Sequence, residues 1–282
     1  MARRSGARRS LLDLLTARFT EYTRDELYRS VMCGEVRVNG GTEIDPRARV
    51  PVTADLELVM RRFVSRGGEK LDAALAAFGL FPAGRVWLDA GASTGGFTDC
   101  LLQHGATTVH AVDVGYNQLA YTLRRDPRVV VRERTNVGSL RREDLSPPPD
   151  AAVCDLSFRS LRGVLRNILC LTSEGWGIAL LKPQFEIAAE HRWSGRSVSP
   201  EKHALERGSG VVGGAVREAV VARVRQELTE KEGVAVHAAV DSPVAGKGGN
   251  REVLLLVGLI GSRELYTQSC CKSRDKSLPN RE

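Results

Sequence analysis

The sequence Asp-Ala-Gly-Ala-Ser-Thr-Gly-Gly at residues 89–96 decides the fold of this chain. The apolar stretch 86–88 comes directly before it, and the apolar residues of a helix follow from Thr98. Glycines between a strand and a helix let the backbone pass close beneath a ligand, and the free N–H groups that begin the helix suit a carboxylate or a phosphate. The stretch therefore predicts the first ligand-binding turn of an α/β domain.

Apolar strands alternate with amphipathic helices from Arg85 onward. We predict strands at 86–88, 109–112, 129–131, 151–154 and 178–181, and helices at 98–103, 118–124 and 161–171. Such an alternation is typical of a parallel, doubly wound sheet, which binds its ligands at the carboxyl ends of its strands. The polar residues that stand at such ends are Asp89, Asp113, Asp155 and Lys182.

The length and charge of the chain limit the classes of protein to which it can belong. With 282 residues, of which 42% are hydrophobic, it can form one full α/β domain and a small additional domain, and it is not disordered throughout. The net charge is +7, and the first nine residues contain four arginines and no acid. This balance favours nucleic acid or an anionic membrane surface as a partner, although a solvated basic face without a partner gives the same composition.

Cysteine usage and hydropathy indicate a soluble, cytoplasmic protein. The six cysteines form no C-x-x-C pair, and we find no histidine near them at ligand spacing, which argues against a metal site. The longest apolar run, 253–260, is too short to cross a bilayer as a helix, and no signal peptide follows the arginine-rich start. We therefore expect reduced thiols and no stable membrane insertion.

The first sixty residues have the pattern of a small α+β domain. Apolar residues recur at three- and four-residue steps between 11 and 19, and a second helix is predicted around 27–31, ending at Gly34. Alternating apolar and polar residues then lead to Asn39-Gly40, the dipeptide that best accepts the positive φ angles of a tight hairpin. We expect the return strand of this hairpin to resume at Ile44.

Residues 34–40, Gly-Glu-Val-Arg-Val-Asn-Gly, together with Thr23-Arg24 resemble the S-four (alpha-L) RNA-binding domain of ribosomal proteins and pseudouridine synthases. Ser-Leu-Leu at 10–12 replaces the Arg-Leu-Asp with which this domain usually opens. Arginines outside the apolar core can contact phosphates, although simple solvation explains them too. With the basic flank, the resemblance predicts RNA contacts at Arg3, Arg4, Arg24 and Arg37, and at Arg66 in the second domain.

The glycine spacing indicates which cofactor the second domain binds. The pattern is D-x-G-x-x-x-G-G, not the G-x-G-x-x-G of dinucleotide-binding proteins, and it is similar to motif I of class I S-adenosylmethionine-dependent methyltransferases. Asp113 follows the second strand, where an acid accepts hydrogen bonds from ribose hydroxyls. Capping of a helix or turn is the alternative role for Asp89 and Asp113. The predicted cofactor-binding residues are Asp89, Gly91, Ser93, Thr94, Gly95, Gly96, Asp113, Asn136 and Asp155.

Two lysines suggest the chemistry that the cofactor serves. A ribose 2′-hydroxyl is a poor nucleophile at neutral pH, so its attack on a sulfonium methyl needs alignment and a group that receives its proton. A lysine meets this need when neighbouring groups lower its pKa. Lys70 and Lys182, with Asp155 and Glu252 to hold them, can form such a group. Taken singly, each of these residues is better explained as a surface or capping residue.

Six motifs occur in order along the chain, at 65–71, 89–102, 113–115, 155–158, 182–186 and 249–252. Together they resemble the TlyA family, once called hemolysin A and now regarded as FtsJ-like rRNA ribose methyltransferases, and the resemblance extends from about 11 to 259. It implies a catalytic tetrad of Lys70, Asp155, Lys182 and Glu252, with Lys182 nearest the 2′-hydroxyl. It further implies a cytidine substrate in ribosomal RNA of the small subunit, the large subunit or both. Phe63 and Arg159 depart from the residues that relatives commonly have.

These patterns divide the chain into an RNA-binding domain at 1–60, a linker at 61–65, a class I methyltransferase domain at 66–260 and a polar tail, expected to be disordered, at 261–282. Residues 187–214 are longer than the corresponding loop of the family and form either a mobile lid or RNA clamp, or an inert insertion. Two other functions stay open. One is a membrane-active cytolysin, and the other is a catalytically silent RNA-binding protein that assists ribosome assembly.

Overall fold

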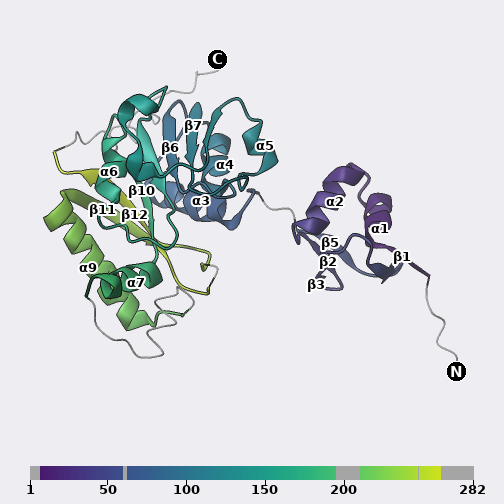
Figure 1. Ribbon diagram of the computed structural model, residues 1–282. Coiled ribbons are helices and arrows are strands. Elements are labelled where there is room, and N and C mark those ends of the chain that lie inside the picture. Colours follow the sequence, from purple (N-terminus) through teal and green to yellow (C-terminus); the bar gives the residue numbers. More distant parts are fainter. Residues whose placement is uncertain (1–6, 60–61, 195–209, 247, 262–282) are drawn as a thin grey trace, which may run out of the picture. The chain divides into compact units, whose positions relative to one another are not determined.

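The computed structural model describes residues 7–59, 62–194, 210–246 and 248–261. The chain divides into two compact units, residues 1–62 and 63–282, and each is described by itself (Figure 1). No helix in the part of the chain that the structure describes is long and apolar enough to cross a membrane.

The first unit packs two helices on short antiparallel strands. β1 pairs with β4, and a three-stranded sheet has the order β3-β2-β5. A buried cluster that includes Leu11, Leu15 and Leu27 joins helices to strands. The elements are β1 (Arg8–Ser10), α1 (Leu11–Arg18), α2 (Arg24–Met32), β2 (Val36–Val38), β3 (Gly41–Thr42), β4 (Arg49–Pro51) and β5 (Leu56–Leu58).

Local signals fix the turns of this unit. Thr23 forms a capping box with Glu26 at the start of α2, and the positive φ of Gly34 follows the end of that helix. Asn39 and Gly40 both have positive φ, as the hairpin prediction requires. The predicted return strand at Ile44 is wrong: β3 comprises Gly41–Thr42, and the Ile44 side chain is exposed because the chain leaves the sheet after two residues.

The second unit contains a seven-stranded sheet flanked by helices (Figure 1). Its mixed α/β architecture agrees with the predicted class I methyltransferase fold. The elements are α3 (Arg66–Phe78), β6 (Val86–Ala90), α4 (Gly96–Gln103), β7 (Thr108–Val112), α5 (Tyr121–Arg124), β8 (Val129–Arg132), η1 (Val137–Ser139), η2 (Arg142–Asp144), β9 (Ala151–Cys154), α6 (Leu165–Cys170), β10 (Trp176–Leu181), α7 (Pro183–Ser194), α9 (Gly214–Glu232), β11 (Val234–Asp241) and β12 (Val253–Leu259).

The strand order of this sheet creates a binding edge. The order is β11-β12-β10-β9-β6-β7-β8, in which β8, β7, β6, β9 and β10 are parallel and β12 runs antiparallel to both its neighbours. The chain runs outward from β6 through β7 to β8 and then returns to β9 on the other side. The carboxyl ends of β6 and β9 therefore flank the point at which the winding reverses, where open α/β sheets bind ligands.

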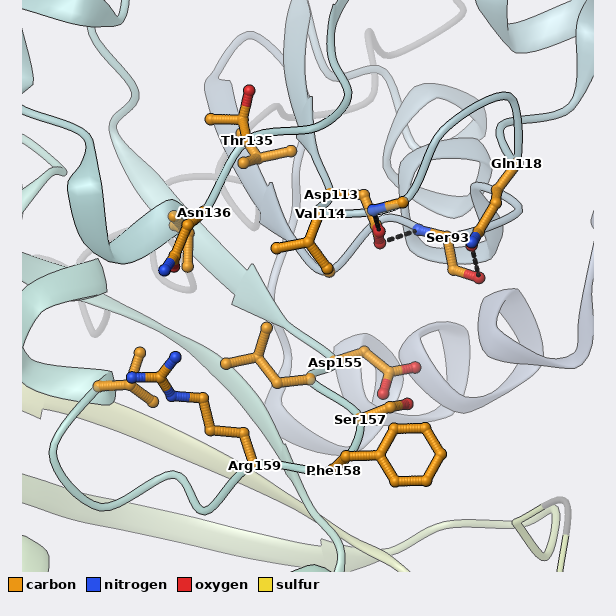
Figure 2. A pocket seen from close by; sticks show the side chains of 16 residues that line it. Ser93, Asp113, Val114, Gln118, Thr135, Asn136, Asp155, Ser157, Phe158 and Arg159 are labelled. Atoms are coloured by element: carbon orange, nitrogen blue, oxygen red, sulfur yellow. Dashed lines mark hydrogen bonds between the residues drawn. The ribbon is translucent and has the colours of Figure 1, made fainter.

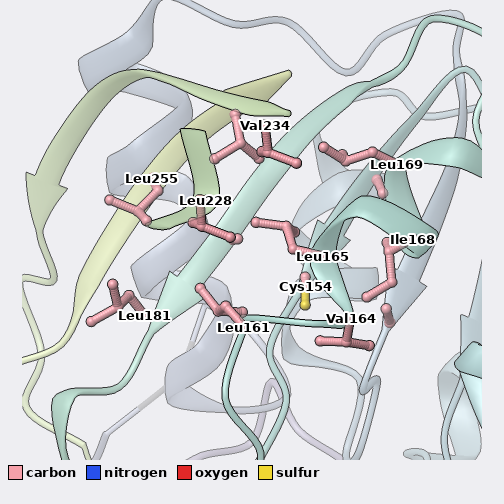
Figure 3. Packing of buried hydrophobic residues seen from close by; sticks show 14 of the residues in the cluster. Cys154, Leu161, Val164, Leu165, Ile168, Leu169, Leu181, Leu228, Val234 and Leu255 are labelled. Atoms are coloured by element: carbon pink, nitrogen blue, oxygen red, sulfur yellow. The ribbon is translucent and has the colours of Figure 1, made fainter. Parts of the chain in front are cut away.

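Alternate residues of the strands supply two separate cores. Val153 packs with α3 and α4 on one face, while Ala152 and Cys154 pack with α6 and α9 on the other. Figure 3 shows the second face, where Leu165 of α6 lies near Leu228 of α9. Burial of both faces explains why the central strands are nearly continuous runs of apolar residues.

Two predicted helices are shorter than expected, because glutamate side chains accept hydrogen bonds from N–H groups near the predicted helix starts. The amides of Gln118 and Leu119 donate to Glu133 Oε1, so α5 begins only at Tyr121. The amide of Leu161 donates to a glutamate of α7, and Gly163 takes a positive φ, so α6 begins only at Leu165.

The division between the units falls after residue 62, within the predicted linker at 61–65. The Phe63 side chain is buried in the core of the second unit and touches α3, where Gly68 leaves room for the ring. Arg61 and residues 262–282 lie outside the described residues.

Candidate active site

The glycine turn after β6 brings the backbone of residue 91 very close to the end of β9. Gly91 has φ of +90°, and a Cβ at this position would lie 2.5 Å from the carbonyl oxygen of Asp155. Ser93 also has positive φ, and its N–H donates to Asp113 Oδ2 over 2.8 Å. The turn therefore ties together the ends of β6, β7 and β9.

A first cavity of about 510 Å³ opens beside this turn (Figure 2). Asp113 and Asn136 lie on its wall with Asp155, and the apolar Val114 and Leu156 complete the lining. Asp113 Oδ1 accepts a hydrogen bond from the N–H of Gly115 at 2.6 Å. A carboxylate held by backbone amides, next to apolar side chains, fits the ribose and base of a nucleoside, and the volume lies in the range of small-molecule sites.

A second cavity of about 600 Å³ shares Gly91, Ser93 and Asp155 with the first. Two lysine–carboxylate pairs stand on its walls. Lys70 Nζ lies 2.5 Å from Glu252 Oε2, and both side chains are buried. Lys182 Nζ lies 2.5 Å from Asp155 Oδ1, although not in the direction of a hydrogen bond, and it donates to Ser157 Oγ over 3.2 Å. The four predicted catalytic residues therefore surround one cavity.

The sheet explains how these residues meet. Asp155 and Lys182 directly follow β9 and β10, whose carboxyl ends lie side by side. Because β12 is antiparallel to β10, Leu181 pairs with Val253, and Glu252 falls at the same edge as Lys182. Lys70 reaches this edge from the second turn of α3.

Aromatic residues line the cavity near Lys182. Phe158 has φ of +61°, an unusual value for a bulky residue, and its ring is largely exposed. The ring centroid lies 5.0 Å from that of Phe185, and Lys182 Nζ lies 5.7 Å from the Phe185 centroid. This arrangement offers an apolar, aromatic surface beside the charged groups.

Two helices begin at the second cavity. Ser65 caps α3, and Gly96 is the first residue of α4. A Cβ at Gly96 would lie 2.9 Å from the amide nitrogen of Gly68, so the two helix ends touch through glycines. Arg66 and Thr94 also line this cavity, which makes its mouth favourable for an anionic group.

Two of the predicted cofactor residues line neither cavity. The Asp89 side chain is completely buried behind the turn, where Oδ2 accepts a hydrogen bond from Thr98 Oγ1 at 2.6 Å. Burial raises the pKa of Asp89 to about 7. Gly95 faces α5, since a Cβ there would lie 2.3 Å from Leu123 Cδ1. Both residues shape the turn without reaching the ligand space, because one points into the core and the other against a helix.

The predicted RNA-binding arginines fall into three groups. Arg24 pairs with Asp13 at 2.9 Å and Arg37 pairs with Glu57 at 3.5 Å, all on the surface of the first unit. Arg66 stands in the second unit at the cavity described above. Arg3 and Arg4 lie outside the described residues, as does most of the insertion at 187–214.

Sequence reasoning assigned no role to some residues of the site. Ser157, which holds Lys182, and Gln184, whose Oε1 is buried without a donor among the described residues, both stand inside motifs that the sequence singled out. Each lies two residues from a predicted catalytic residue, and this closeness in sequence could have identified them as part of the site. Gln118, which lines the first cavity and bonds Ser93 Oγ, carries no such signal.

The structure also corrects the reading of the cysteines. His104 follows Cys100 by four residues, and these two with Asp72 place their ligand atoms within 4.8 Å of one another. His104 Nε2 is 2.7 Å from Asp72 Oδ1, a hydrogen bond between α3 and the end of α4. A histidine therefore does stand at ligand spacing from a cysteine, which is itself buried.

Comparison with known proteins shows extensive similarity. The model of the FtsJ-like methyltransferase family matches residues 63–259. The 16S/23S rRNA (cytidine-2′-O)-methyltransferase TlyA of Mycobacterium tuberculosis is 41% identical over 254 residues, which cover 88% of this chain and 90% of that protein. Hemolysin A of Brachyspira hyodysenteriae is 34% identical over 258 residues, covering 84% and 98%. A solved structure from Streptococcus thermophilus, described as a candidate hemolysin, matches with a TM-score of 0.64, 33% identity and 94% coverage of both chains.

Proposed function

Because the chain belongs to the FtsJ-like methyltransferase family, and within it to the TlyA group, we propose that it methylates the ribose 2′-hydroxyl of a cytidine in ribosomal RNA. The observation that carries the proposal is the cavity with two lysine–carboxylate pairs, which adjoins a cavity of nucleoside size. The similarity to the rRNA (cytidine-2′-O)-methyltransferase of Mycobacterium tuberculosis supports the choice of cytidine and of ribosomal RNA.

S-adenosylmethionine is the proposed cofactor, and it supplies an electrophilic methyl group when bound. Asp113 and Asn136 would hold its nucleoside part in the first cavity, with Val114 beside the base. The close approach of Gly91 to the end of β9 admits no side chain, which keeps the space above the turn open for the cofactor. The residues present therefore fit this group.

The second cavity is the proposed site of the target nucleotide. Lys182, held by Asp155 and Ser157, would bind the ribose hydroxyl and stabilise the charge that develops on its oxygen. Lys70 and Glu252 complete the electrostatic surroundings of that site. Most of the rate enhancement would come from alignment of the hydroxyl oxygen with the methyl group.

RNA binding by the first unit completes the proposal. Its two helices and its sheet leave Arg24 and Arg37 on the surface, where they can exchange their carboxylate partners for phosphates. The proposed substrate is ribosomal RNA within ribosomal subunits, which these arginines would help to bind.

The proposal is tested by incubating the full chain with labelled S-adenosylmethionine and unmodified ribosomal subunits, then mapping alkali-resistant linkages. We expect one resistant linkage at a cytidine. Lys182→Ala should lower the rate roughly 10²- to 10⁴-fold, because it removes a group that acts on the reacting oxygen. Lys231→Ala is the matched control, since Lys231 pairs with Glu227 at 2.7 Å on the surface of α9, and this variant should keep full activity.

Other outcomes would overturn the proposal. Label on a base, or no label with either kind of subunit, excludes ribose methylation. Lysis of cells by purified protein that does not modify RNA would establish the cytolysin function that the name of the Brachyspira hyodysenteriae relative suggests. Undiminished function in cells after Lys182→Ala would instead indicate an RNA-binding protein without catalytic activity.

A further inference from the structure

Glu186 is a buried carboxylate that lies beside both catalytic segments and lines neither cavity described above. It stands one helical turn after Lys182 in α7, and its N–H donates to the Lys182 carbonyl over 3.3 Å. Burial raises the pKa of Glu186, and hydrogen-bond donors around the carboxylate oppose that effect. A buried carboxylate is costly unless its oxygens are satisfied, so the donors that surround it reveal its role.

The donors all come from one short segment, residues 160–162. The N–H of Leu161 donates to Glu186 Oε1 over 2.8 Å, and the Ser160 hydroxyl donates to Oε2. Arg162 Nε also donates to Oε2, over 3.3 Å, and the same guanidinium donates to the Glu186 carbonyl over 3.1 Å. One residue of α7 thus binds three consecutive residues of the loop between β9 and α6.

That loop carries the groups proposed to act on the substrate. It begins with Asp155 and Ser157, which hold Lys182, and continues with Phe158 in its left-handed conformation. A non-glycine residue in this conformation is strained and persists only where surrounding contacts enforce it. The contacts that enforce it are the packing of Phe158 on Phe185 and, two residues later, the bonds to Glu186.

We infer that Glu186 is a positioning residue for methyl transfer: its carboxylate fixes the Asp155–Phe158 segment relative to Lys182. The inference rests on the proposed function. Lys182 stands between the end of β10 and the start of α7, and its partners stand on the loop, so the distance between them depends on what joins α7 to the loop. Misplacement of reacting groups by about 1 Å can cost about 10²-fold in rate.

A second carboxylate that binds Arg162, Glu227, provides a matched control. The other terminal nitrogen of Arg162 donates to Glu227 of α9 over 2.6 Å, so the same arginine is held by two carboxylates. Only Glu186 also binds Ser160 and Leu161. Glu227→Gln weakens the hold on the arginine and leaves the loop contacts in place, whereas Glu186→Gln puts an amide group where three donors need acceptors.

The experiment compares wild type, Glu186→Gln and Glu227→Gln in the full chain. For Glu186→Gln we expect kcat for ribosomal RNA to fall roughly 10- to 100-fold, while the Kd for S-adenosylmethionine and the KM for RNA change less than about threefold. Glu227→Gln should keep kcat within about threefold. Hydrogen exchange of residues 156–163 should accelerate in Glu186→Gln only, a readout that does not depend on activity. Glu186→Asp, which retains the charge, should restore part of kcat.

The outcomes separate this inference from the proposed function. If wild type methylates no ribose, the proposed function fails, and the exchange measurement still reports on the loop. If wild type is active but kcat and exchange of Glu186→Gln match those of Glu227→Gln, the positioning role is wrong. Equal losses of kcat, cofactor affinity and melting temperature would show a general structural role and would also overturn it. If Glu186→Gln does not fold, Ser160→Ala removes one donor, and the inference then requires a lower kcat at unchanged cofactor affinity.

Discussion

At the scale of single residues, Asp89 shows how strongly its environment controls a side chain of this site. The carboxyl is completely buried, one oxygen accepts the Thr98 hydroxyl, and Oδ1 has no donor among the described residues. Burial raises its pKa from 3.8 to about 7, with the charge of Asp155 acting in the same direction. Asp89, the first residue of the glycine motif, is therefore a core carboxyl that keeps its proton up to about pH 7.

The raised pKa gives a pH dependence of stability with a definite sign. Between about pH 4 and pH 7 the folded protein keeps a proton on Asp89 that the unfolded chain has lost, so stability falls as the pH rises through this range. Asp89→Asn removes this titration. Its free energy of unfolding, relative to wild type, should increase by up to about 1.4 kcal/mol per pH unit in that range, as measured by urea unfolding at pH 5 and pH 8.

Asp126→Asn is the control for this measurement. The hydrogen bond with Arg128 lowers the pKa of Asp126, so this group is ionised in both states from pH 5 upward. Its effect on stability should be the same at both pH values. A difference between Asp89→Asn and wild type that does not change with pH would show that Asp89 is ionised in the folded protein.

At the scale of elements, the contact between the first turns of α3 and α4 depends on glycine. A Cβ at Gly96 would meet Ser65 Oγ at 2.2 Å and the Gly68 amide nitrogen at 2.9 Å. Since backbone cannot move aside as a flexible side chain does, we expect Gly96→Ala to destabilise the second unit by about 1–3 kcal/mol and to weaken cofactor binding. Calorimetry and titration with S-adenosylmethionine measure the two effects.

Gly214→Ala is the matched variant for this prediction. Gly214 is also the first residue of a helix, α9, and nothing lies within 4 Å of the position its Cβ would take. Its melting temperature should equal that of wild type or slightly exceed it, because alanine favours the helix. Equal melting temperatures of Gly96→Ala and Gly214→Ala would mean that the first turns of α3 and α4 can move apart without loss of stability.

At the scale of the whole molecule, the two units have separate cores, and the proposed RNA and cofactor contacts of Arg24 and Asp113 fall in different units. The double variant Arg24→Gln/Arg37→Gln should therefore weaken RNA binding while leaving the Kd for S-adenosylmethionine unchanged. If both arginines contact phosphates, the slope of log K against log salt should decrease by about 2. Binding to ribosomal subunits at several salt concentrations gives this slope.

An arginine of the second unit serves as the reference for this measurement. Arg141 is exposed and pairs with Glu143 at 3.1 Å, as Arg24 pairs with Asp13. Arg141→Gln should leave the slope nearly unchanged. An equal decrease for Arg141→Gln and for the double variant would show general attraction to RNA with no special role for the first unit.

The sequence predicted much of this molecule because many of its signals are local. Apolar runs located five of the seven strands of the larger sheet to within a few residues, and the hairpin dipeptide at 39–40 has the predicted positive φ angles. Asp113, Asp155 and Lys182 were placed at strand ends from sequence and are found there. The boundaries of α5 and α6 were missed because Glu133 and Glu186, which capture the N–H groups before these helices, lie far away in sequence.

The sequence by itself determined the kinds of elements, their order and the polar residues that stand at their ends, because periodicity and turn chemistry act between near neighbours. Only the tertiary structure decided which of those residues meet. Lys70 and Glu252 are 182 positions apart, and they pair because β12 runs antiparallel to β10 and begins where β10 ends. Burial of Asp89 and the bonds of Glu186 likewise depend on packing between distant segments, which no local pattern encodes.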